Sequence, residues 1–149
     1  MSTRSTTHFT YGAGRPATAI IYRHADGYPE GQGKDLLEFF HEVAETVQDT
    51  RFNDPSYLAA KLVVWLARKF AVRYERVGES GRNYDQVPTG YLDFISVGVV
   101  QQDPSDIEYR YIVDCSTMID GRPGVLVEEG YGSDWKPLGE VATVLKAAV

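Results

Sequence analysis

Hydrophobic and polar residues alternate with a period of two in several short stretches of the chain, which predicts β-strands. The clearest stretch is residues 107–116 (IEYRYIVDCS), where apolar side chains recur at every second position. Similar β-branched and aromatic composition predicts further strands over 5–12, 18–24, 91–100 and 125–129. A glycine- and proline-containing turn joins the first two of these, so we expect them to form a β-hairpin.

The apolar pattern changes to a helical period in the middle of the chain. It predicts one helix over 35–49 and a second over 55–70, which follows an Asp-Pro pair. Asp35 and Glu38 form an N-terminal cap pattern for the first helix. Residues 71–77 (AVRYERV) fit either a continuation of the second helix or a separate strand.

Runs of strands and runs of helices, without strict alternation, favour an α+β fold. We expect an antiparallel sheet with two central helices and a C-terminal helix, beginning after Gly139, packed on one face. Residues 78–90 (GESGRNYDQVPTG) are polar and lack a period, which predicts a mobile loop. No repeat or linker divides the chain, so residues 1–149 are predicted to form a single domain.

The helix predicted over 55–70 is apolar around most of its circumference. A helix of this kind is either central in a domain or covered by another subunit. We therefore expect a homodimer through this helix if the sheet does not cover it.

The charge balance narrows the class of partner. The 149 residues carry a net charge of −6 and have a pI of about 5.0. This composition argues against direct nucleic-acid binding, which needs a basic surface, and suits docking on a basic partner protein. The single cysteine, Cys115, excludes an intramolecular disulfide and fits a reducing compartment. With no apolar segment of about 20 residues, the sequence predicts a cytoplasmic protein without a membrane span.

A glycine-rich connection, residues 22–34 (YRHADGYPEGQGK), joins the second strand to the first helix. Free N–H groups at the start of a helix, here expected at residues 33–38, favour an anion, and glycines let it approach the backbone. Arg23, His24 and Lys34 would add positive charge. The alternative interpretation is a tight turn whose glycines serve only backbone geometry.

This connection does not match the phosphate-binding loop (P-loop) of proteins that bind nucleoside triphosphates. Five residues separate Gly27 from Gly33, whereas that motif requires four, and Asp35 occupies the place of the Ser or Thr that would hold magnesium. We therefore expect neither a metal nor a cofactor.

Two residues of the connection suggest enzyme chemistry. His24 and Asp26 could act as a base and its orienting carboxylate in a small hydrolase. The three histidines lack ligand spacing, so a metal site is not predicted. Cys115 is interpreted as a small buried side chain.

The stretch YRHADGYPEGQGKDLLEFF, the opening MSTRST and the later IEYRYIVD together resemble a family of small uncharacterised phage and bacterial proteins. Its members have a Met-x-Thr-Arg-Ser start and a Tyr-Arg-x-x-Asp-Gly-Tyr-Pro segment before Gly-x-Gly. Where this chain has Ala25, the family often has Trp or Tyr. The resemblance implies a viral accessory role, without an established activity. It directs attention to Arg4, Arg23, His24, Asp26, Tyr28, Gly31, Gly33 and Lys34.

Three functional hypotheses follow from the sequence. The first is a non-enzymatic protein that binds an anionic, nucleotide-like small ligand at residues 22–34, such as a defence antagonist that sequesters a signalling nucleotide. The second is an acidic interaction module that inhibits a host nucleic-acid-binding protein. The third is the small hydrolase that uses His24 and Asp26.

Overall fold

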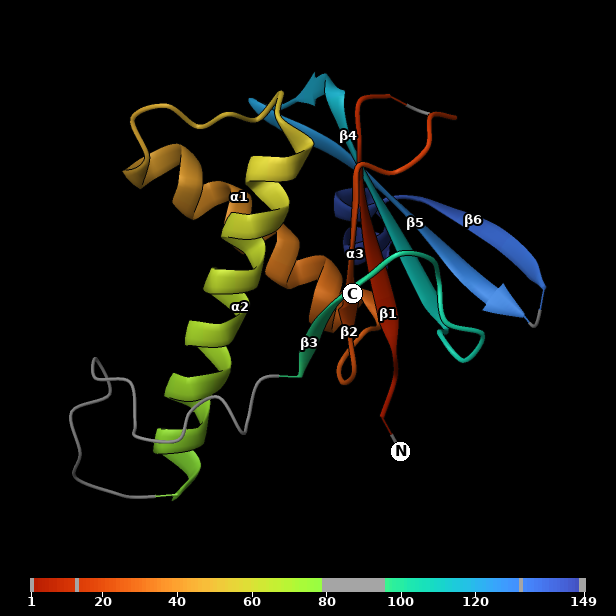
Figure 1. Ribbon diagram of the computed structural model, residues 1–149, viewed down its shortest axis with the longest axis horizontal. Helices are drawn as coiled ribbons and strands as arrows, with labels where there is room; N and C mark the ends of the chain where they lie inside the picture. Colours follow the sequence, from red (N-terminus) through yellow and green to blue (C-terminus); the bar gives the residue numbers. More distant parts are fainter. Residues whose placement is uncertain (1, 13, 79–95, 132, 148–149) are drawn as a thin grey trace.

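The computed structural model describes residues 2–12, 14–78, 96–131 and 133–147. It has the expected α+β fold, in which helices cover one face of a six-stranded sheet (Figure 1). The strand order is β3-β2-β1-β4-β5-β6. All neighbouring strands are antiparallel except β1 and β4, which are parallel.

The strands agree with the alternating segments of the sequence, with one addition. They are β1 (Ser5–Thr10), β2 (Ala19–Arg23), β3 (Val97–Val100), β4 (Tyr109–Ile119), β5 (Arg122–Tyr131) and β6 (Asp134–Glu140). The predicted hairpin is confirmed as β1 and β2. Of the strand expected over 91–100, the described part is β3. Strand β6 (DWKPLGE) has no apolar alternation, and its Pro137 is tolerated because β6 is an edge strand.

The helices begin and end differently from the prediction. A π-helical turn, η1 (Pro29–Gly33), leads directly into α1 (Lys34–Thr46). The cap predicted at Asp35 and Glu38 is therefore wrong, because the helical segment already begins at Pro29. Helix α2 (Pro55–Gly78) continues through residues 71–77, so these are helical and not a strand. The last helix is α3 (Val141–Ala147). Of the loop predicted over 78–90, Gly78 is instead the last residue of α2, and the remainder lies outside the described residues.

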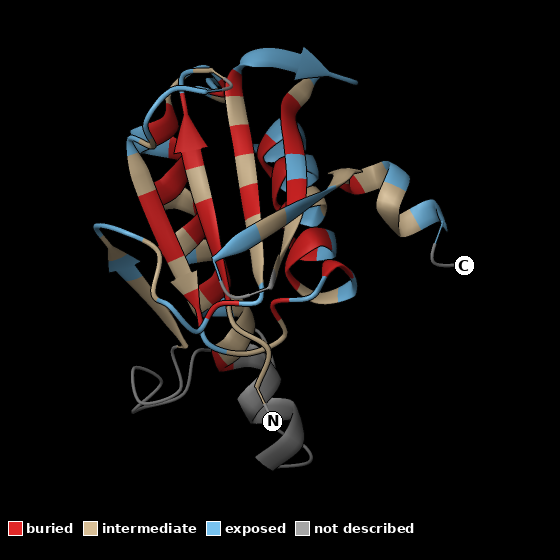
Figure 2. Cartoon of the chain, turned by 90° about the vertical axis from the view of Figure 1, so that its right-hand side faces the viewer, coloured by how far each residue is buried: buried red, intermediate tan, exposed pale blue. Residues whose placement is uncertain are grey.

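The core lies between the sheet and its helices. Along β4 the buried residues Tyr111, Val113 and Cys115 alternate with less buried ones, whereas β1 is buried at all positions except His8; Figure 2 shows these buried positions in red. Helix α2 contacts β1 and β2, whereas α1 and α3 contact β5. Fully buried side chains come from both layers: Phe9, Leu36, Phe40, Leu58, Leu62, Leu66, Tyr111, Val113, Val125 and Val127. The sheet thus covers one side of α2, while Val64 on another side is 70% exposed. No helix among the described residues is long and apolar enough to cross a membrane.

On the face of the sheet that carries no helix, the side chains of β1 and β4 bond to one carboxylate, Asp103, in the connection between β3 and β4. Asp103 accepts hydrogen bonds from Thr6 Oγ1 at 2.6 Å and from Arg110 at 3.3 Å, and its Oδ1 lies 2.7 Å from His8 Nε2. Arg110 also pairs with Glu128 at 3.1 Å. Partial burial works to raise the pKa of Asp103, but the bonds to His8, Thr6 and Arg110 outweigh it, so the pKa lies below its ordinary value.

We expect Asp103→Asn to lower the free energy of unfolding by about 1–3 kcal/mol at neutral pH, because three donors lose a charged acceptor. Since the folded-state pKa is lowered, the carboxylate stabilises the fold above its ordinary pKa of about 4 and loses this effect as the pH falls toward the folded value. The difference between wild type and variant should therefore shrink from pH 5 to pH 3. Urea unfolding across this range measures it, with the exposed Asp134→Asn as the control. If the difference in free energy of unfolding between wild type and variant does not change with pH, the proposed charge network is contradicted.

Candidate functional site

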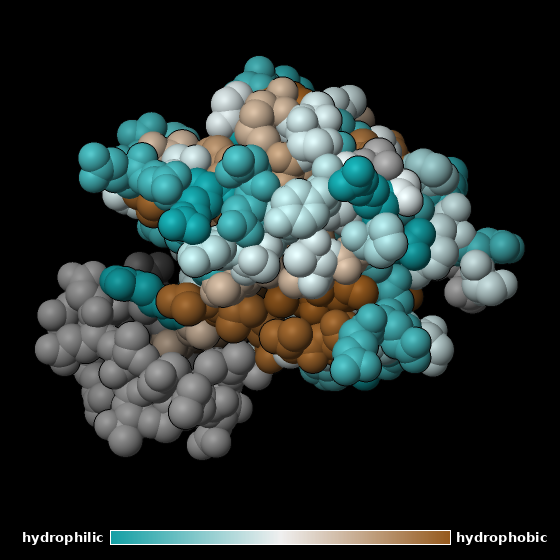
Figure 3. Space-filling view, turned by 45° about the horizontal axis from the view of Figure 1, so that its top comes forward, coloured by the Kyte–Doolittle hydropathy of each residue, from teal (hydrophilic) through white to brown (hydrophobic). Residues whose placement is uncertain are grey.

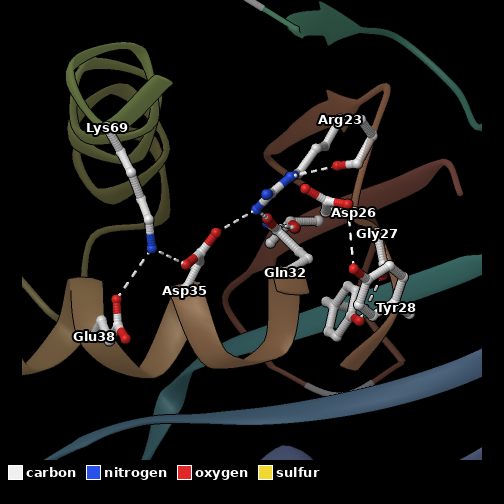
Figure 4. A network of polar contacts seen from close by, with 11 residues as sticks. Arg23, Asp26, Gly27, Tyr28, Gln32, Asp35, Glu38 and Lys69 are labelled. Atoms are coloured by element: carbon white, nitrogen blue, oxygen red, sulfur yellow. Dashed lines mark hydrogen bonds and ion pairs between the residues drawn. The ribbon is translucent and has the colours of Figure 1, made fainter. Parts of the chain in front are cut away.

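The candidate site is built around Arg23, the last residue of β2. Its side chain points to the helix-covered face and is only 3% exposed. Arg23 Nε donates to the Ala25 carbonyl oxygen at 2.6 Å, and Nη1 donates to Gln32 Oε1 at 2.7 Å and to Asp35 Oδ2 at 2.6 Å (Figure 4). The guanidinium also lies 5.1 Å from the centre of the Phe70 ring. These contacts fix its position.

A second cation reaches the same carboxylate from α2. Lys69 pairs with Asp35 and also with Glu38, at 3.2 Å (Figure 4). Burial by itself would lower the pKa of Lys69, but hydrogen bonds and charges from Asp35 and Glu38 outweigh it and raise the pKa above its usual value. Lys69 is therefore positively charged at neutral pH. The chain of ion pairs joins β2, α1 and α2.

A pocket of about 220 Å³ opens where these elements meet. Its charged lining consists of three cationic side chains and four carboxylates, which leaves one net negative charge. Tyr28 and Phe70 add aromatic surface. The charged residues of the lining are Arg23, Lys34, Lys69, Asp26, Glu30, Asp35 and Glu38.

The internal hydrogen bonds of Arg23 leave two of its N–H groups, both on Nη2, for other partners. Arg23 has five N–H groups, of which those on Nε and Nη1 bond to Ala25, Gln32 and Asp35. The hydrogen bonds that Arg23 makes to described residues use none of the N–H groups on Nη2. The side chain as a whole is only 3% exposed and lines the pocket, but Nη2 is not one of the buried atoms without a partner, so this edge is open to solvent. A buried guanidinium with an unused edge is a ready donor to an anionic or carbonyl oxygen.

The glycines of the connection are required by close backbone packing. A methyl group at Gly31 would lie 2.1 Å from the Asp26 carbonyl oxygen, and one at Gly27 would lie 2.8 Å from Ser5 Cβ. At Gly33 it would lie 3.3 Å from Val141. These contacts support the turn interpretation for the glycines themselves, and the pocket is formed by side chains around the turn.

The backbone N–H groups expected to face an anion are occupied. Lys34 N–H donates to the carbonyl oxygens of Pro29 and Gly31, and Gln32 N–H donates to those of Asp26 and Tyr28. The prediction of a free helix start at residues 33–38 is therefore wrong. The reason is that η1 extends the helix toward its N-terminus through these positions.

The other predicted site residues separate into two groups. Asp26 and Tyr28 stay with the pocket, where the Tyr28 hydroxyl donates to Asp26 Oδ1 at 3.2 Å. Arg4 and His24 lie on the opposite face, because residues 23 and 24 alternate across the strand. There His24 Nδ1 lies 2.8 Å from the Tyr22 hydroxyl and 3.4 Å from Arg4 Nε.

This separation bears on the enzyme chemistry. In the part of the chain that the structure describes, His24 Nδ1 lies beside the Tyr22 hydroxyl and Asp26 accepts a hydrogen bond from Tyr28, which is not the pairing of a base with its orienting carboxylate. Cys115 is buried, and burial together with Asp114 and Asp54 raises the pKa of its thiol to about 12. Within the described ranges, no cluster of three His, Cys, Asp or Glu side chains could hold a metal ion.

Six residues of the site were not predicted as site residues from the sequence: Gln32, Lys69 and Phe70, and the carboxylates Glu30, Asp35 and Glu38. Lys69 and Phe70 were interpreted only as part of a helix. Lys69 pairs with Asp35, 34 positions away, and the Phe70 ring lies beside the Arg23 guanidinium, 47 positions away. No local pattern signals such a contact. A signal did exist for Asp35, a carboxylate just after the glycines, but it was interpreted as a cap.

Comparison of the chain with protein-family models, with curated protein sequences and with solved structures gave no match in any of the three.

The packing around the glycines predicts that alanine substitutions at Gly31 and Gly98 differ greatly in their effect on the free energy of unfolding. Gly31→Ala should lower the free energy of unfolding by roughly 2–4 kcal/mol, because the new methyl group collides with the Asp26 carbonyl. Gly98→Ala is the matched control, since its methyl group would meet only Tyr22 Cδ1 at 3.9 Å. Its stability should stay unchanged or rise by up to about 1 kcal/mol. Chemical denaturation measures both, and equal stability of the two variants would show that Gly31 is not required by the fold.

Proposed function

We propose that this protein is a non-catalytic binding protein that holds the anionic end of a small polar ligand in the pocket beside Arg23. The observation that carries the proposal is the Nη2 edge of the Arg23 guanidinium, which takes no part in the hydrogen bonds to described residues and is open to solvent where Arg23 lines the pocket. A fixed donor of this kind needs no reorganisation to bind an oxyanion, and low solvent exposure strengthens the bond. Lys34 and Lys69 add two ammonium groups to the same lining.

The charge of the lining narrows the ligand class. Asp26, Glu30 and Glu38 face the pocket together with the cations, and the net charge is negative. A polyphosphate would meet repulsion from these carboxylates. A ligand with a single anionic group and neighbouring hydrogen-bond donors, such as hydroxyl or amino groups, satisfies both signs of charge. Nucleoside monophosphates and amino acids have this chemistry.

The size of the pocket limits how much of the ligand is enclosed. Its volume of about 220 Å³ is below the 300–1,000 Å³ typical of sites that enclose a drug-sized molecule. Only the anionic end and its nearest donors would lie inside. The remainder would extend along Tyr28, which is 37% exposed and offers an aromatic surface for a planar ring.

The two other hypotheses remain predictions. The hydrolase lacks support because His24 and Asp26 are held by different partners. The acidic interaction module agrees with the net charge of −6, but no structural observation favours it over the pocket.

A pair of opposite substitutions tests the proposal. Lys34→Ala, which removes an exposed cation of the pocket, should weaken binding of a nucleoside monophosphate about tenfold. Glu30→Gln, which removes a repelling carboxylate, should strengthen it a few-fold. Lys146→Ala on α3 is the matched control and should leave binding unchanged. Isothermal calorimetry or the shift in melting temperature reports the affinity, because a ligand that binds only the folded state raises the melting temperature.

The panel should hold nucleoside mono- and triphosphates, cyclic dinucleotides, amino acids and inorganic phosphate. Binding of a member that has a single anionic group, with opposite effects of Lys34→Ala and Glu30→Gln, would support the pocket, since a change in fold stability alone would not alter ligand affinity in opposite directions. Absence of binding across the panel, or equal effects of Lys34→Ala and Lys146→Ala, would overturn the proposal. Arg23→Ala is unsuitable, because loss of a buried ion-pair partner destabilises the fold by about 3–5 kcal/mol.

A further inference from the structure

Helices α1 and α2 leave an apolar groove between them, which adjoins the Arg23 pocket at Glu38. It forms two adjoining hollows of about 410 and 560 Å³. Both hollows are lined by Trp65, and the first also by Phe39, Val43 and Val64. Val64 is 70% exposed in the single chain, which is high for a valine at the centre of a helix.

The two sides of this groove carry opposite charge. Helix α1 contributes Glu42 and Glu45, and α2 contributes Lys61 and Arg68. Among the described residues, none of these four takes part in an ion pair. The groove is therefore an apolar channel with an acidic edge and a basic edge that do not pair with each other.

We propose that the groove is the interface between two copies of this chain, related by a two-fold axis that runs along the groove. Such an axis exchanges the two edges, so the acidic α1 edge of one copy faces the basic α2 edge of its partner. Val64 and Trp65 of the two copies would pack at the centre and remove exposed apolar surface from water. This proposal is independent of the ligand pocket.

The charge pattern favours a second copy over an unrelated partner. A surface with both signs at opposite edges complements itself under this one symmetry operation. An axis across the groove would instead bring acid against acid and base against base, which is repulsive. The pattern therefore specifies the orientation of the dimer as well as its location.

Another apolar surface provides the competing location. Figure 3 shows a continuous band of hydrophobic residues on the face where α2 and β3 lie. Val99 on β3, an edge strand, is 75% exposed. Edge strands of this composition can pair with other chains, but β3 has no charged residue to specify the partner.

Two valines of similar exposure, Val64 and Val99, distinguish the two locations. Val64→Glu should convert the dimer to a monomer, because it places a charge at the centre of the groove without disturbing the fold of the single chain. Val99→Glu should leave the dimer intact. Sedimentation velocity from about 1 to 100 μM measures the oligomeric state, and circular dichroism checks that both variants are folded.

A charge exchange tests the orientation. Glu42→Arg and Arg68→Glu should each weaken the dimer at least about tenfold, and the double variant should restore affinity. Arg15→Glu, in the exposed β1–β2 connection, makes the same charge change elsewhere and should have no effect. A wild-type protein that is monomeric up to 100 μM would overturn the proposal. So would a dimer lost with Val99→Glu and kept with Val64→Glu, or a double variant no better than the single ones.

Discussion

The buried ion pair of Arg23 and Asp35 is the constraint that the local structure must satisfy. Removing two charges from water costs several kcal/mol per ion, and this cost is offset only when the remaining donors and acceptors are bonded. Here the Ala25 carbonyl, Gln32, Lys69 and the Phe70 ring supply those contacts. The pair therefore fixes how the end of β2, the π-helical turn and both long helices are placed. The pocket is a consequence of that placement.

The π-helical turn explains how the chain meets this requirement. Between Asp26 and Lys34 the backbone turns so closely that Gly31 almost touches the Asp26 carbonyl, and Gly27 touches β1. The wide turn places Gln32, and Asp35 just after it, on the side facing Arg23. π-helical segments are rare and frequently occur at functional sites. The glycines are thus needed for the close packing of the backbone, and this packing in turn places the side chains that form the pocket.

Helix α2 connects the two surfaces for which we propose roles. Lys69 and Phe70 face the pocket, whereas Val64 and Arg68 face the groove. Trp65 lies between these surfaces. The centre of its ring lies 6.0 Å from the centre of the Phe39 ring and 5.1 Å from the Lys69 ammonium nitrogen. Because Lys69 also holds Asp35, the aromatic packing of α1 against α2 and the charges of the pocket depend on one another.

The sequence alone determined the fold class and most strands and helices, because period-two and helical patterns are local and reflect which side of each element is buried. It also excluded the phosphate-binding loop (P-loop) of nucleoside-triphosphate-binding proteins. The residues that it indicated as being of interest include Arg23, Asp26, Tyr28, Gly31 and Lys34. Strand β6 was missed because an edge strand with proline needs no alternation.

Tertiary structure decided the remainder. It separated His24 and Arg4 from Arg23, since neighbouring residues of a strand face opposite sides, and it gave Asp35 a buried partner where the sequence suggested a helix cap. It also brought Lys69 and Phe70 to the site. The arrival of Lys69 and Phe70 depends on the packing of α2 across β2, a contact between distant segments that no local pattern encodes.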